Sequence, residues 1–452
     1  MKKVLSIMMV LAICFTVVGC TQSTPAATAP TTEVTTQGTA PQTADTETEA
    51  EKTIVKIGVL APLSGSVSSQ GTLMKMGLDA CLEYFNQEVG FKNLNNVEVQ
   101  LVYADSESTP DVGQTEFERL VNVENVIAVL GSYQSAVTGP CATLANKYHV
   151  PYVVINAISD GILSEDSNYV FRPCSGTYSQ EASQKNWLET LNKISPIKTL
   201  AFVGSADDYG DGNLISFTRI AEQLGMEITV VDQVQSGVAD MSGTVQKVKN
   251  ANVDLVLASL QLNEALLFQK QMKEYKCAIP VLANGGGYSD SNFIASCGDS
   301  GEYVTSSAGW NNDLLNTFSE EQQKWVGRMQ EIGEGRAIIE TCCNSWLALG
   351  LTLDAMDKAA ATDRETLAAA IDQTDLGLDD WPNMFTRFRY VRFEDAQLPD
   401  GTMMYNQNFG IDLLFVQILD GTWRLISPFS VIGDYGSATN PMVWLPPSWD
   451  ER

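Results

Sequence analysis

Short apolar runs alternate with longer segments of helical periodicity along most of the chain. The stretch 126–159 shows the pattern in compact form. The apolar run 126–130 predicts a strand buried on both faces, and the next run, 152–155, predicts a second one. Between them, Ser135 is predicted as the N-cap of a helix that reaches Tyr148. The stretch therefore predicts a strand–helix–strand unit of a parallel sheet.

The same alternation recurs in two series before residue 290. Two sheets with their own loops at the strand ends imply two lobes that face a cleft, so the predicted fold class is α/β with two doubly wound parallel-sheet lobes. The runs predicted as strands are 54–60 and 97–103 in the first series, and 199–203, 228–233, 255–259 and 281–283 in the second. The segments predicted as helices are 73–89, 114–123, 214–224, 244–249 and 265–275.

The last third of the chain changes character. Three helices are predicted at 319–332, 338–360 and 364–373, followed by two strands at 409–419 and 421–426. Asp420-Gly421 lies between alternating apolar residues, which is a strong hairpin signal. The Pro- and Trp-rich stretch 441–449 is predicted to lie along the surface or the hinge.

The first 52 residues are not expected to belong to the fold. A charged start and an apolar segment at 4–18 predict a signal peptide at 1–19. The sequence Val-Val-Gly-Cys that ends at Cys20 resembles a bacterial lipobox, which implies cleavage before Cys20 and lipid attachment to its sulfur. The alternative is an ordinary signal peptide followed by a chance cysteine. Residues 20–52 are rich in Thr, Pro, Ala and Glu and predict a disordered tether, so we expect an extracytoplasmic protein held at the membrane by its lipid anchor alone.

Charge and residue usage exclude several classes of partner and cofactor. The formal net charge of -27 argues against nucleic acid or acidic lipid as a partner. Of nine cysteines, seven remain after the signal peptide and the lipobox, and they are scattered and form no C-x-x-C pair. With His149 as the one histidine, a zinc site is not expected, and no metal or other cofactor is predicted. The cysteines are expected to be small buried residues, with a Cys277–Cys297 disulfide as the alternative.

The loops at the strand ends carry the candidate chemistry. Small hydroxylic residues follow both strands of the stretch 126–159, and ligands of open α/β sheets bind at the carboxyl ends of strands. A helix N-terminus at that edge can hold a carboxylate, and desolvated hydrogen bonds to a charged group each contribute about 1.5–3 kcal/mol. Ser132 and Ser159 are therefore expected to matter most. No P-loop and no G-x-S-x-G elbow occurs, so we predict binding without catalysis.

Six segments carry a family resemblance in matching order: 56–71 (KIGVLAPLSGSVSSQG), 131–135, 150–159, 171–173, 207–210 (DDYG) and 417–428. Together they resemble the type I solute-binding proteins of the leucine/isoleucine/valine-binding branch, lipoproteins that supply ABC importers. The resemblance runs from Lys52 to Arg452. It implies two lobes, 53–172 with 304–380 and 173–303 with 381–452, joined by a three-segment hinge and closing on a ligand. It also implies an importer permease and ATPase as partners.

The resemblance also implies a ligand site. Gln70 stands where a side chain flanks the ligand, the loop Ser132–Ser135 where backbone and hydroxyl groups meet a carboxylate, and Tyr209 where an aromatic ring covers the ligand. Ala157 and Ser159 stand at a paired backbone and hydroxyl contact. The full expected site is Gln70, Ser132, Tyr133, Gln134, Ser135, Ala157, Ile158, Ser159, Tyr209, Gln261, Asn284, Gly285 and Glu340.

One departure from the family pattern leaves the ligand open. Amino-acid-binding members use an acid from the second lobe to pair with the ligand's ammonium, whereas the matching region 282–288 (LANGGGY) has none. Either Glu340 or Asp208 serves instead, or the ligand lacks an α-ammonium and is an amide or an aromatic acid. The glycines either make room for a larger ligand or form a turn that needs positive φ. A binding protein that reports to a receptor is the alternative to an importer subunit.

Overall fold

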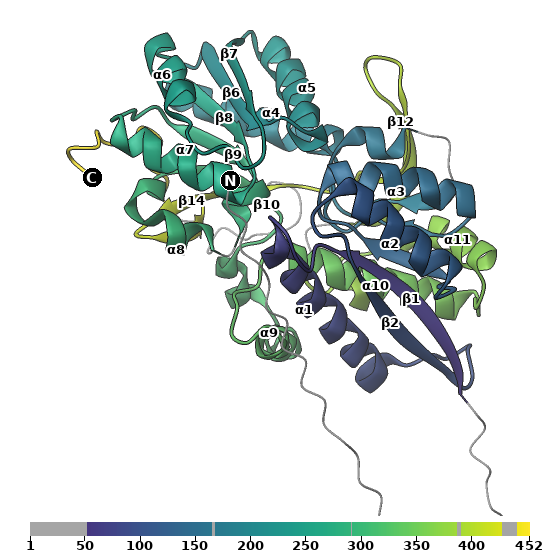
Figure 1. Cartoon of the computed structure of the whole chain (residues 1–452). Helices are drawn as coiled ribbons and strands as arrows, with labels where there is room; N and C mark the ends of the chain where they lie inside the picture. Colours follow the sequence, from purple (N-terminus) through teal and green to yellow (C-terminus); the bar gives the residue numbers. More distant parts are fainter. Residues whose placement is uncertain (1–51, 165–167, 291, 387–389, 427–440) are drawn as a thin grey trace, which may run out of the picture. The chain divides into compact units, whose positions relative to one another are not determined.

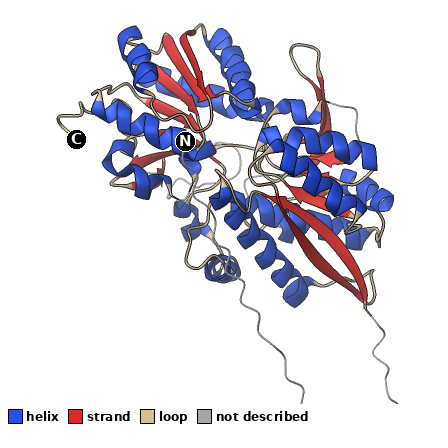
Figure 2. Cartoon of the chain, in the orientation of Figure 1, coloured by secondary structure: helices blue, strands red, loops and turns tan. Residues whose placement is uncertain are grey.

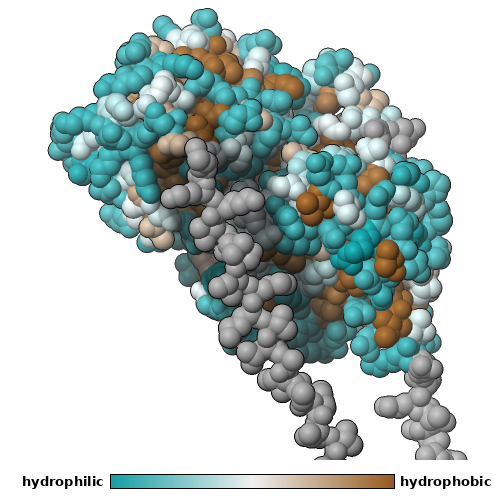
Figure 3. Space-filling view, in the orientation of Figure 1, coloured by the Kyte–Doolittle hydropathy of each residue, from teal (hydrophilic) through white to brown (hydrophobic). Residues whose placement is uncertain are grey.

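The computed structural model describes residues 52–164, 168–290, 292–386, 390–426 and 441–452. The predicted signal peptide, Cys20 and nearly all of the tether lie outside the described residues. Within the described residues, no helix is long and apolar enough to cross a membrane. The face of the molecule in Figure 3 is mainly hydrophilic with small separate apolar areas, as the acidic composition leads one to expect.

The first sheet has five parallel strands in the order β2-β1-β3-β4-β5 (Figures 1 and 2). Side chains of β1 pack into two different cores, one on each face of the sheet, because successive side chains of a strand point to opposite faces. Ile57 and Val59 pack in one core with α1 and α10, and Leu60 packs in another with α2 and α3. The elements are β1 Thr53–Ala61, α1 Ser68–Tyr84, β2 Val97–Asp105, α2 Pro110–Asn122, β3 Ala128–Gly131, α3 Ser135–Tyr148, β4 Tyr152–Val153 and β5 Val170–Phe171.

The second sheet has seven strands in the order β15-β14-β10-β9-β8-β6-β7. The strands β10, β9, β8, β6 and β7 are parallel to one another, and β14 and β15 form an antiparallel edge. The elements are α4 Thr177–Ile194, β6 Thr199–Ser205, α5 Asp208–Leu224, β7 Glu227–Val234, α6 Ser242–Ala251, β8 Leu255–Ser259, α7 Leu262–Glu274, β9 Val281–Asn284, α8 Phe293–Cys297, β10 Thr305–Ala308, β14 Leu414–Leu419 and β15 Thr422–Leu425.

A small antiparallel sheet, β11-β12-β13, lies beside the first sheet. An isolated parallel bridge between Arg172 and Gln407 joins it to the end of β5. The remaining elements are α9 Glu320–Ile332, α10 Glu340–Lys358, α11 Arg364–Asp372, β11 Asp375–Leu376, β12 Val391–Gln397 and β13 Met403–Asn408. Short 3₁₀ turns lie at Asp160–Leu163, Gly286–Ser289, Gly298–Gly301, Asn312–Thr317 and Trp381–Asn383, and a π-helical turn at Phe85–Val89 ends α1.

The α/β class with two parallel-dominated sheets is confirmed, but the chain is divided between the sheets differently from the expected boundaries. The strand Thr305–Ala308 pairs with β9 and β14 in the second sheet, although 304–380 was expected in the first lobe. Conversely, β12 and β13 lie with the first sheet, although 381–452 was expected in the second lobe. Strand membership depends on which backbone groups pair at a distance, and local sequence does not specify that pairing.

The predicted hairpin is confirmed, whereas the predicted helix cap is not. The hairpin β14–β15 turns at Asp420 and Gly421, which have φ values of 52° and 67°. Helix α9 follows a capping box in which Ser319 and Gln322 satisfy each other's backbone N–H groups. The predicted N-cap Ser135 is wrong: Gln134 holds the extended cap position and Ser135 is the first helical residue.

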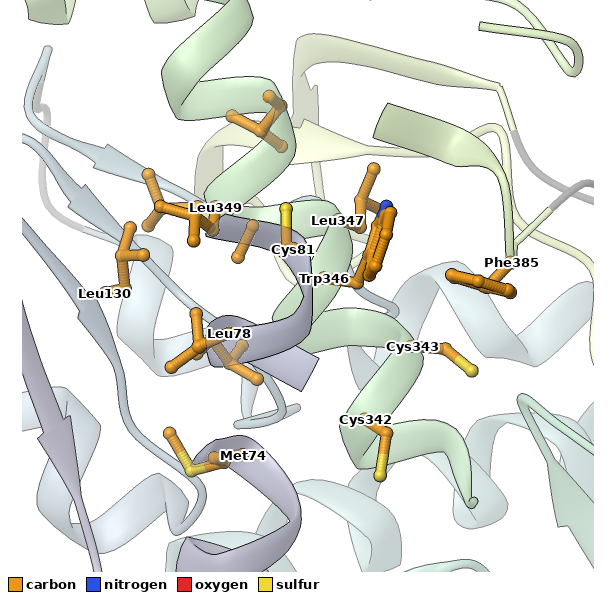
Figure 4. Close-up of a cluster of buried hydrophobic side chains, with 14 of the residues drawn as sticks. Met74, Leu78, Cys81, Leu130, Cys342, Cys343, Trp346, Leu347, Leu349 and Phe385 are labelled. Atoms are coloured by element: carbon orange, nitrogen blue, oxygen red, sulfur yellow. The ribbon is translucent and has the colours of Figure 1, made fainter. Parts of the chain in front are cut away.

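Helix α10 forms the centre of the largest core, which Figure 4 shows. Cys342 and Cys343 are adjacent on this helix and both are buried (Figure 4). All seven described cysteines are buried and free, so the expectation of small buried residues is met and the alternative Cys277–Cys297 disulfide is absent from the described structure.

Helices α1 and α10 approach closely at Gly77. A Cβ added there would lie 2.1 Å from the carbonyl oxygen of Cys342 and 2.9 Å from the Cβ of Ser345. Since backbone cannot move aside cheaply in a packed interior, this position requires glycine. Gly327, in the middle of α9, has nothing within 4 Å of an added Cβ.

We therefore expect Gly77→Ala to lower the free energy of unfolding by about 1–3 kcal/mol, because the added methyl overpacks the α1–α10 contact. Gly327→Ala is the matched control and should raise it by about 0.5–1 kcal/mol through helix propensity. Urea unfolding of both variants measures the two effects. Equal stability of the two variants would contradict the close approach at Gly77.

Candidate functional site

A cavity lies where the carboxyl ends of strands from both sheets meet. Loops after β3 and β4 provide one wall, and loops after β6, β8, β9 and β10 provide the other, while α10 contributes its first turn. The lining residues are Tyr133, Gln134, Ser135, Asn156, Ile158, Cys174, Ser175, Gln180, Tyr209, Gln261, Asn284, Gly285, Gly286, Ser289, Ser307, Ala308, Glu340, Asn344 and Leu413.

Helices α3, α7 and α10 begin at this cavity. Helix α3 follows Gln134 and α7 follows Gln261, and neither N-cap residue accepts a side-chain hydrogen bond from its helix. The first N–H groups of a helix have no partner inside the helix, and the aligned peptide dipoles leave partial positive charge there. The third helix, α10, carries the acid Glu340 at its first position. The α3 and α7 termini therefore remain available to a negative or polar group in the cavity.

Ser135 ties the two first-sheet loops together. Its Oγ accepts a hydrogen bond of 3.3 Å from the backbone N–H of Ser159. The hydroxyl can still donate its own proton. The loop after β3 and the loop after β4 are thus held in one arrangement beside the cavity.

The second-sheet wall rests on a buried amide network centred on Asn284. Its Oδ1 accepts from Gln184 Nε2 at 2.9 Å and from Ser307 Oγ, and its Nδ2 donates to Asn213 and, at 3.2 Å, to Gln180. All its side-chain positions are used, so the amide is fixed and its neighbours present a rigid polar surface.

Tyr209 is anchored rather than mobile. It is buried, and its hydroxyl donates to the backbone oxygen of Asn284 at 2.7 Å. Burial raises the pKa of Tyr209, and burial with the negative charges of Asp290 and Glu340 raises the pKa of Tyr133 well above the usual range. Both phenols therefore stay protonated and act as donors at neutral pH.

The glycine run Gly285-Gly286-Gly287 mainly forms a tight turn. Gly285 and Gly286 have φ values of 61° and 57°, which side-chain-bearing residues rarely adopt. An added Cβ at Gly286 would lie 2.5 Å from the Tyr209 hydroxyl oxygen, and one at Gly287 would lie 2.3 Å from the backbone carbon of Gln261. Gly286 and Gly287 thus permit close packing, whereas a Cβ at Gly285 would meet only Ser289 Oγ, at 3.9 Å.

The cavity lining contains one acid and no Lys, Arg or His among the described residues. Glu340 is half-buried, and its Oε2 accepts a 2.9 Å hydrogen bond from the backbone N–H of Gly309. Asp208, the other candidate acid, lines a different cavity beside Asp211 and Arg219. Of the two acids proposed from sequence, only Glu340 reaches this cavity.

Nine of the thirteen expected site residues line the cavity, and four lie behind it. Gln70 is buried and joins Asp290 to Thr341, through hydrogen bonds of 2.9 and 2.7 Å. The backbone oxygens of Ala157 and Ser159 accept from the buried Arg172 at 3.4 and 2.7 Å. Ser132 is fully buried at the end of β3. These four support the lining and are not part of it.

Sequence reasoning also missed lining residues. Asn156 lines the cavity but was not expected to, because only its loop neighbours from Ala157 to Ser159 were predicted as ligand contacts. Ser175, Gln180 and Asn344 also line it, and they come from segments that were not predicted to follow a strand of the site. Gln134, Asn156 and Gln261 each have a buried side-chain oxygen without a hydrogen-bond partner in the described structure. Buried polar atoms are nearly always paired, so three such amides around one cavity indicate a place for a polar solute.

Within the described residues, no group of three or more His, Cys, Asp or Glu side chains is placed to hold a metal ion. The arrangement offers neutral donors, two uncapped helix N-termini and one carboxylate. It can hold a small polar molecule by hydrogen bonds at one end and a positive group at the other.

Comparison with known proteins identifies the family to which this chain is related. The family model described as periplasmic binding protein matches residues 54–404. Leu/Ile/Val-binding protein homolog 7 of Brucella abortus is 27% identical over 260 residues, which are 56% of this chain and 61% of that protein. The match therefore spans about three fifths of the length of this curated relative.

Two solved structures resemble the chain with a TM-score of 0.66 each. One is the branched-chain amino acid transporter substrate binding protein of Streptococcus pneumoniae in complex with isoleucine, at 17% identity over 83% of this chain and 100% of that one. The other is an ABC transporter solute binding protein of Rhodopseudomonas palustris in complex with p-hydroxybenzoic acid, at 18% identity over 85% and 100%. At these identities the likeness shows the fold.

The family match covers most of the chain, the fold is shared with solved solute-binding proteins, and the cavity lies between the strand ends of two sheets. The chain belongs to the periplasmic binding protein family, a family of solute-binding proteins and not of enzymes, and it has the type I fold of the solved solute-binding proteins.

Proposed function

We propose that this protein is the extracytoplasmic, lipid-anchored solute-binding subunit of an ABC importer, and that it captures a small carboxylate-bearing solute, an amino acid or a related acid, between two closing lobes. The observation that carries the proposal is the cavity itself, which is built from strand ends of both sheets and has two uncapped helix N-termini in its wall. Solved proteins of this fold were determined with isoleucine and with p-hydroxybenzoic acid.

The carboxylate of the solute is proposed to lie at the start of α3. No basic side chain lines the cavity among the described residues, so an anion must be held by neutral donors. The backbone N–H groups of the first turn and the Ser135 hydroxyl are such donors, and the helix dipole favours negative charge there. Hydrogen bonds to a desolvated carboxylate are roughly twice as strong as neutral ones.

An ammonium group is proposed to lie against Glu340. A buried ammonium without an acidic partner is costly, and Glu340 is the carboxylate of this lining. This favours an α-amino acid over a deaminated acid. The p-hydroxybenzoate complex of a relative keeps an aromatic acid as the second candidate.

Closure follows from the placement of the walls. A solute that touches both walls contacts all of its partners only when the lobes are together, so it shifts the equilibrium toward the closed state. A permease can then distinguish loaded from empty protein by the closed arrangement, and transport would be driven by the ATPase of the importer.

A thermal-shift screen of residues 52–452 tests the solute class. Amino acids, their deaminated acids, amides and aromatic carboxylates are compared. We expect amino acids to raise the melting temperature by several degrees, since a ligand at a hundredfold excess over Kd stabilises by about 2.7 kcal/mol. No shift with any of the four sets would refute a small carboxylate as the solute.

Glu340→Gln tests the ammonium contact. We expect affinity for the best amino acid to fall at least about thirtyfold, because the variant leaves the buried ammonium without its counter-charge. Affinity for the matching deaminated acid should not fall. Calorimetric titration measures both, and Glu334→Gln, whose side chain is 87% exposed, is the control. An equal loss for both ligands would mean that Glu340 only shapes the cavity.

Replacing Cys20 tests the anchor. In cells, Cys20→Ser should move the protein from the membrane fraction to the soluble fraction, because one acyl-modified cysteine is the proposed attachment. Metabolic labelling with a fatty-acid probe should be lost in the same variant. If the variant still sediments with membranes, attachment does not depend on Cys20.

A further inference from the structure

The lining of the solute cavity is mostly polar. Among the described residues that line it, six have carboxamide side chains and six have hydroxyl groups, whereas the aliphatic side chains are those of Ile158, Ala308 and Leu413. A branched aliphatic group in such a lining would take amides and hydroxyls out of water without giving them hydrogen-bond partners, which is costly. The lining therefore favours a solute whose side chain is polar.

The helices α3 and α7 present different N-termini to this cavity. The first turn of α3 carries no acidic residue, whereas the first turn of α7 carries Glu264, which is 3% exposed. Oε1 of Glu264 accepts a 2.7 Å hydrogen bond from the backbone N–H of Gly237. A carboxylate in the first turn offsets the positive end of the helix dipole. The N-terminus of α7 therefore suits a neutral acceptor better than the carboxylate of a solute.

Gln261 adds an acceptor at the N-terminus of α7. It precedes the helix in an extended conformation, lines the cavity and accepts no side-chain hydrogen bond from the helix. Its Oε1 is buried and has no hydrogen-bond partner in the described structure. A buried acceptor costs free energy unless a donor reaches it. This part of the cavity thus combines backbone donors with a side-chain acceptor.

A primary carboxamide matches this combination. Its oxygen can accept from the first N–H groups of α7, and its NH₂ group can donate to Gln261. The pairing also holds when the Gln261 amide is turned over, because each of the two amides offers both a donor and an acceptor. A carboxylate offers acceptors alone, and an alkyl group offers neither a donor nor an acceptor.

The wall around Gln261 is rigid. The Asn284 amide has all its side-chain positions in use, and the Tyr209 hydroxyl donates to the Asn284 backbone oxygen at 2.7 Å. Gly287 packs so closely on Gln261 that an added Cβ would lie 2.3 Å from the Gln261 carbonyl carbon. A rigid site that hydrogen-bonds one group of a ligand discriminates strongly against analogues that lack the group, because its own polar atoms are left unpaired.

We propose that the solute is an α-amino acid whose side chain ends in a primary carboxamide, and that Gln261 and the N-terminus of α7 bind this carboxamide. Gln261 is then a specificity-determining residue of the second-sheet wall. The inference rests on the proposed function, from which it takes the position of the α-carboxylate at the start of α3.

The test is calorimetric titration of residues 52–452, which contain every described helix and strand. L-Glutamine is compared with L-glutamate and L-asparagine with L-aspartate, and L-leucine is the apolar reference. We expect one of the amides to bind at least about tenfold more tightly than its matched acid and than leucine, because only the amide pairs with both the donors and the acceptor.

The outcomes separate this inference from the proposed function. If leucine or an acid binds as tightly as the better amide, the carboxamide inference is wrong and the proposed function stands. If none of the five amino acids binds, the inference fails, and the proposed function fails with it only when the thermal-shift screen is also silent.

Gln261→Leu locates the carboxamide. The variant removes both polar atoms at similar size, so the preferred amide should bind at least about tenfold more weakly, while leucine should lose no affinity. Gln373→Leu, at an exposed position, is the matched control and should change neither affinity. Equal losses for the amide and leucine would mean that Gln261 only shapes the cavity, which would overturn the inference.

Glu264→Gln tests the difference between the two helix N-termini, also in case Gln261→Leu does not fold. The variant removes the charge from the first turn of α7 but keeps an oxygen that can accept from Gly237. The matched acid should then gain about two- to fivefold in affinity relative to its amide, since the helix dipole is no longer offset. An unchanged ratio of the two affinities would contradict the placement of the carboxamide at α7.

Discussion

A buried guanidinium holds the parts of this protein in place. Arg172 is 0% exposed and donates to the backbone oxygens of Ala157 and Ser159, to Asp160 and to the side chain of Gln407. Burial lowers its pKa in spite of the carboxylate of Asp160. A buried charge is tolerated only when its hydrogen bonds are satisfied with good geometry, so all these partners must be in register at once.

Arg172 lies where several distant segments of the chain meet. It follows β5, where the chain leaves the first sheet for the second, and its backbone pairs with Asn406 and Asn408 of β13, which returns from the far end of the chain. A Cβ at Gly176 would lie 2.0 Å from the guanidinium, so the next residues pass close by. One residue thereby fixes a crossing segment, the loop behind the solute cavity and a distant strand.

The solute cavity combines several kinds of polar group. It is lined by amides, hydroxyls and helix N-termini, which suit a polar solute with a negative end. Glu340, at the first position of its own helix and hydrogen-bonded to the backbone N–H of Gly309, adds a carboxylate to this lining.

The sequence by itself determined what depends on neighbours along the chain. It predicted the alternation of strands and helices, a helix over 319–332 and the hairpin at Asp420-Gly421, because hydrophobic period and turn chemistry act over a few residues. Nine of the thirteen residues expected at the site line the solute cavity, and they were expected there through the family resemblance and because strand ends of parallel sheets gather at one edge.

Only the tertiary structure decided which distant groups meet. Asp290 and Gln70 are 220 positions apart and share a hydrogen bond, and Thr305–Ala308 joins the second sheet through pairing with β9 and β14. The backbone oxygens of the loop residues Ala157 and Ser159 accept hydrogen bonds from Arg172, which follows a different strand. Local sequence could not reveal these outcomes, because a polar group's partner is set by the packing of whole elements, and the same residue can serve a ligand or the fold.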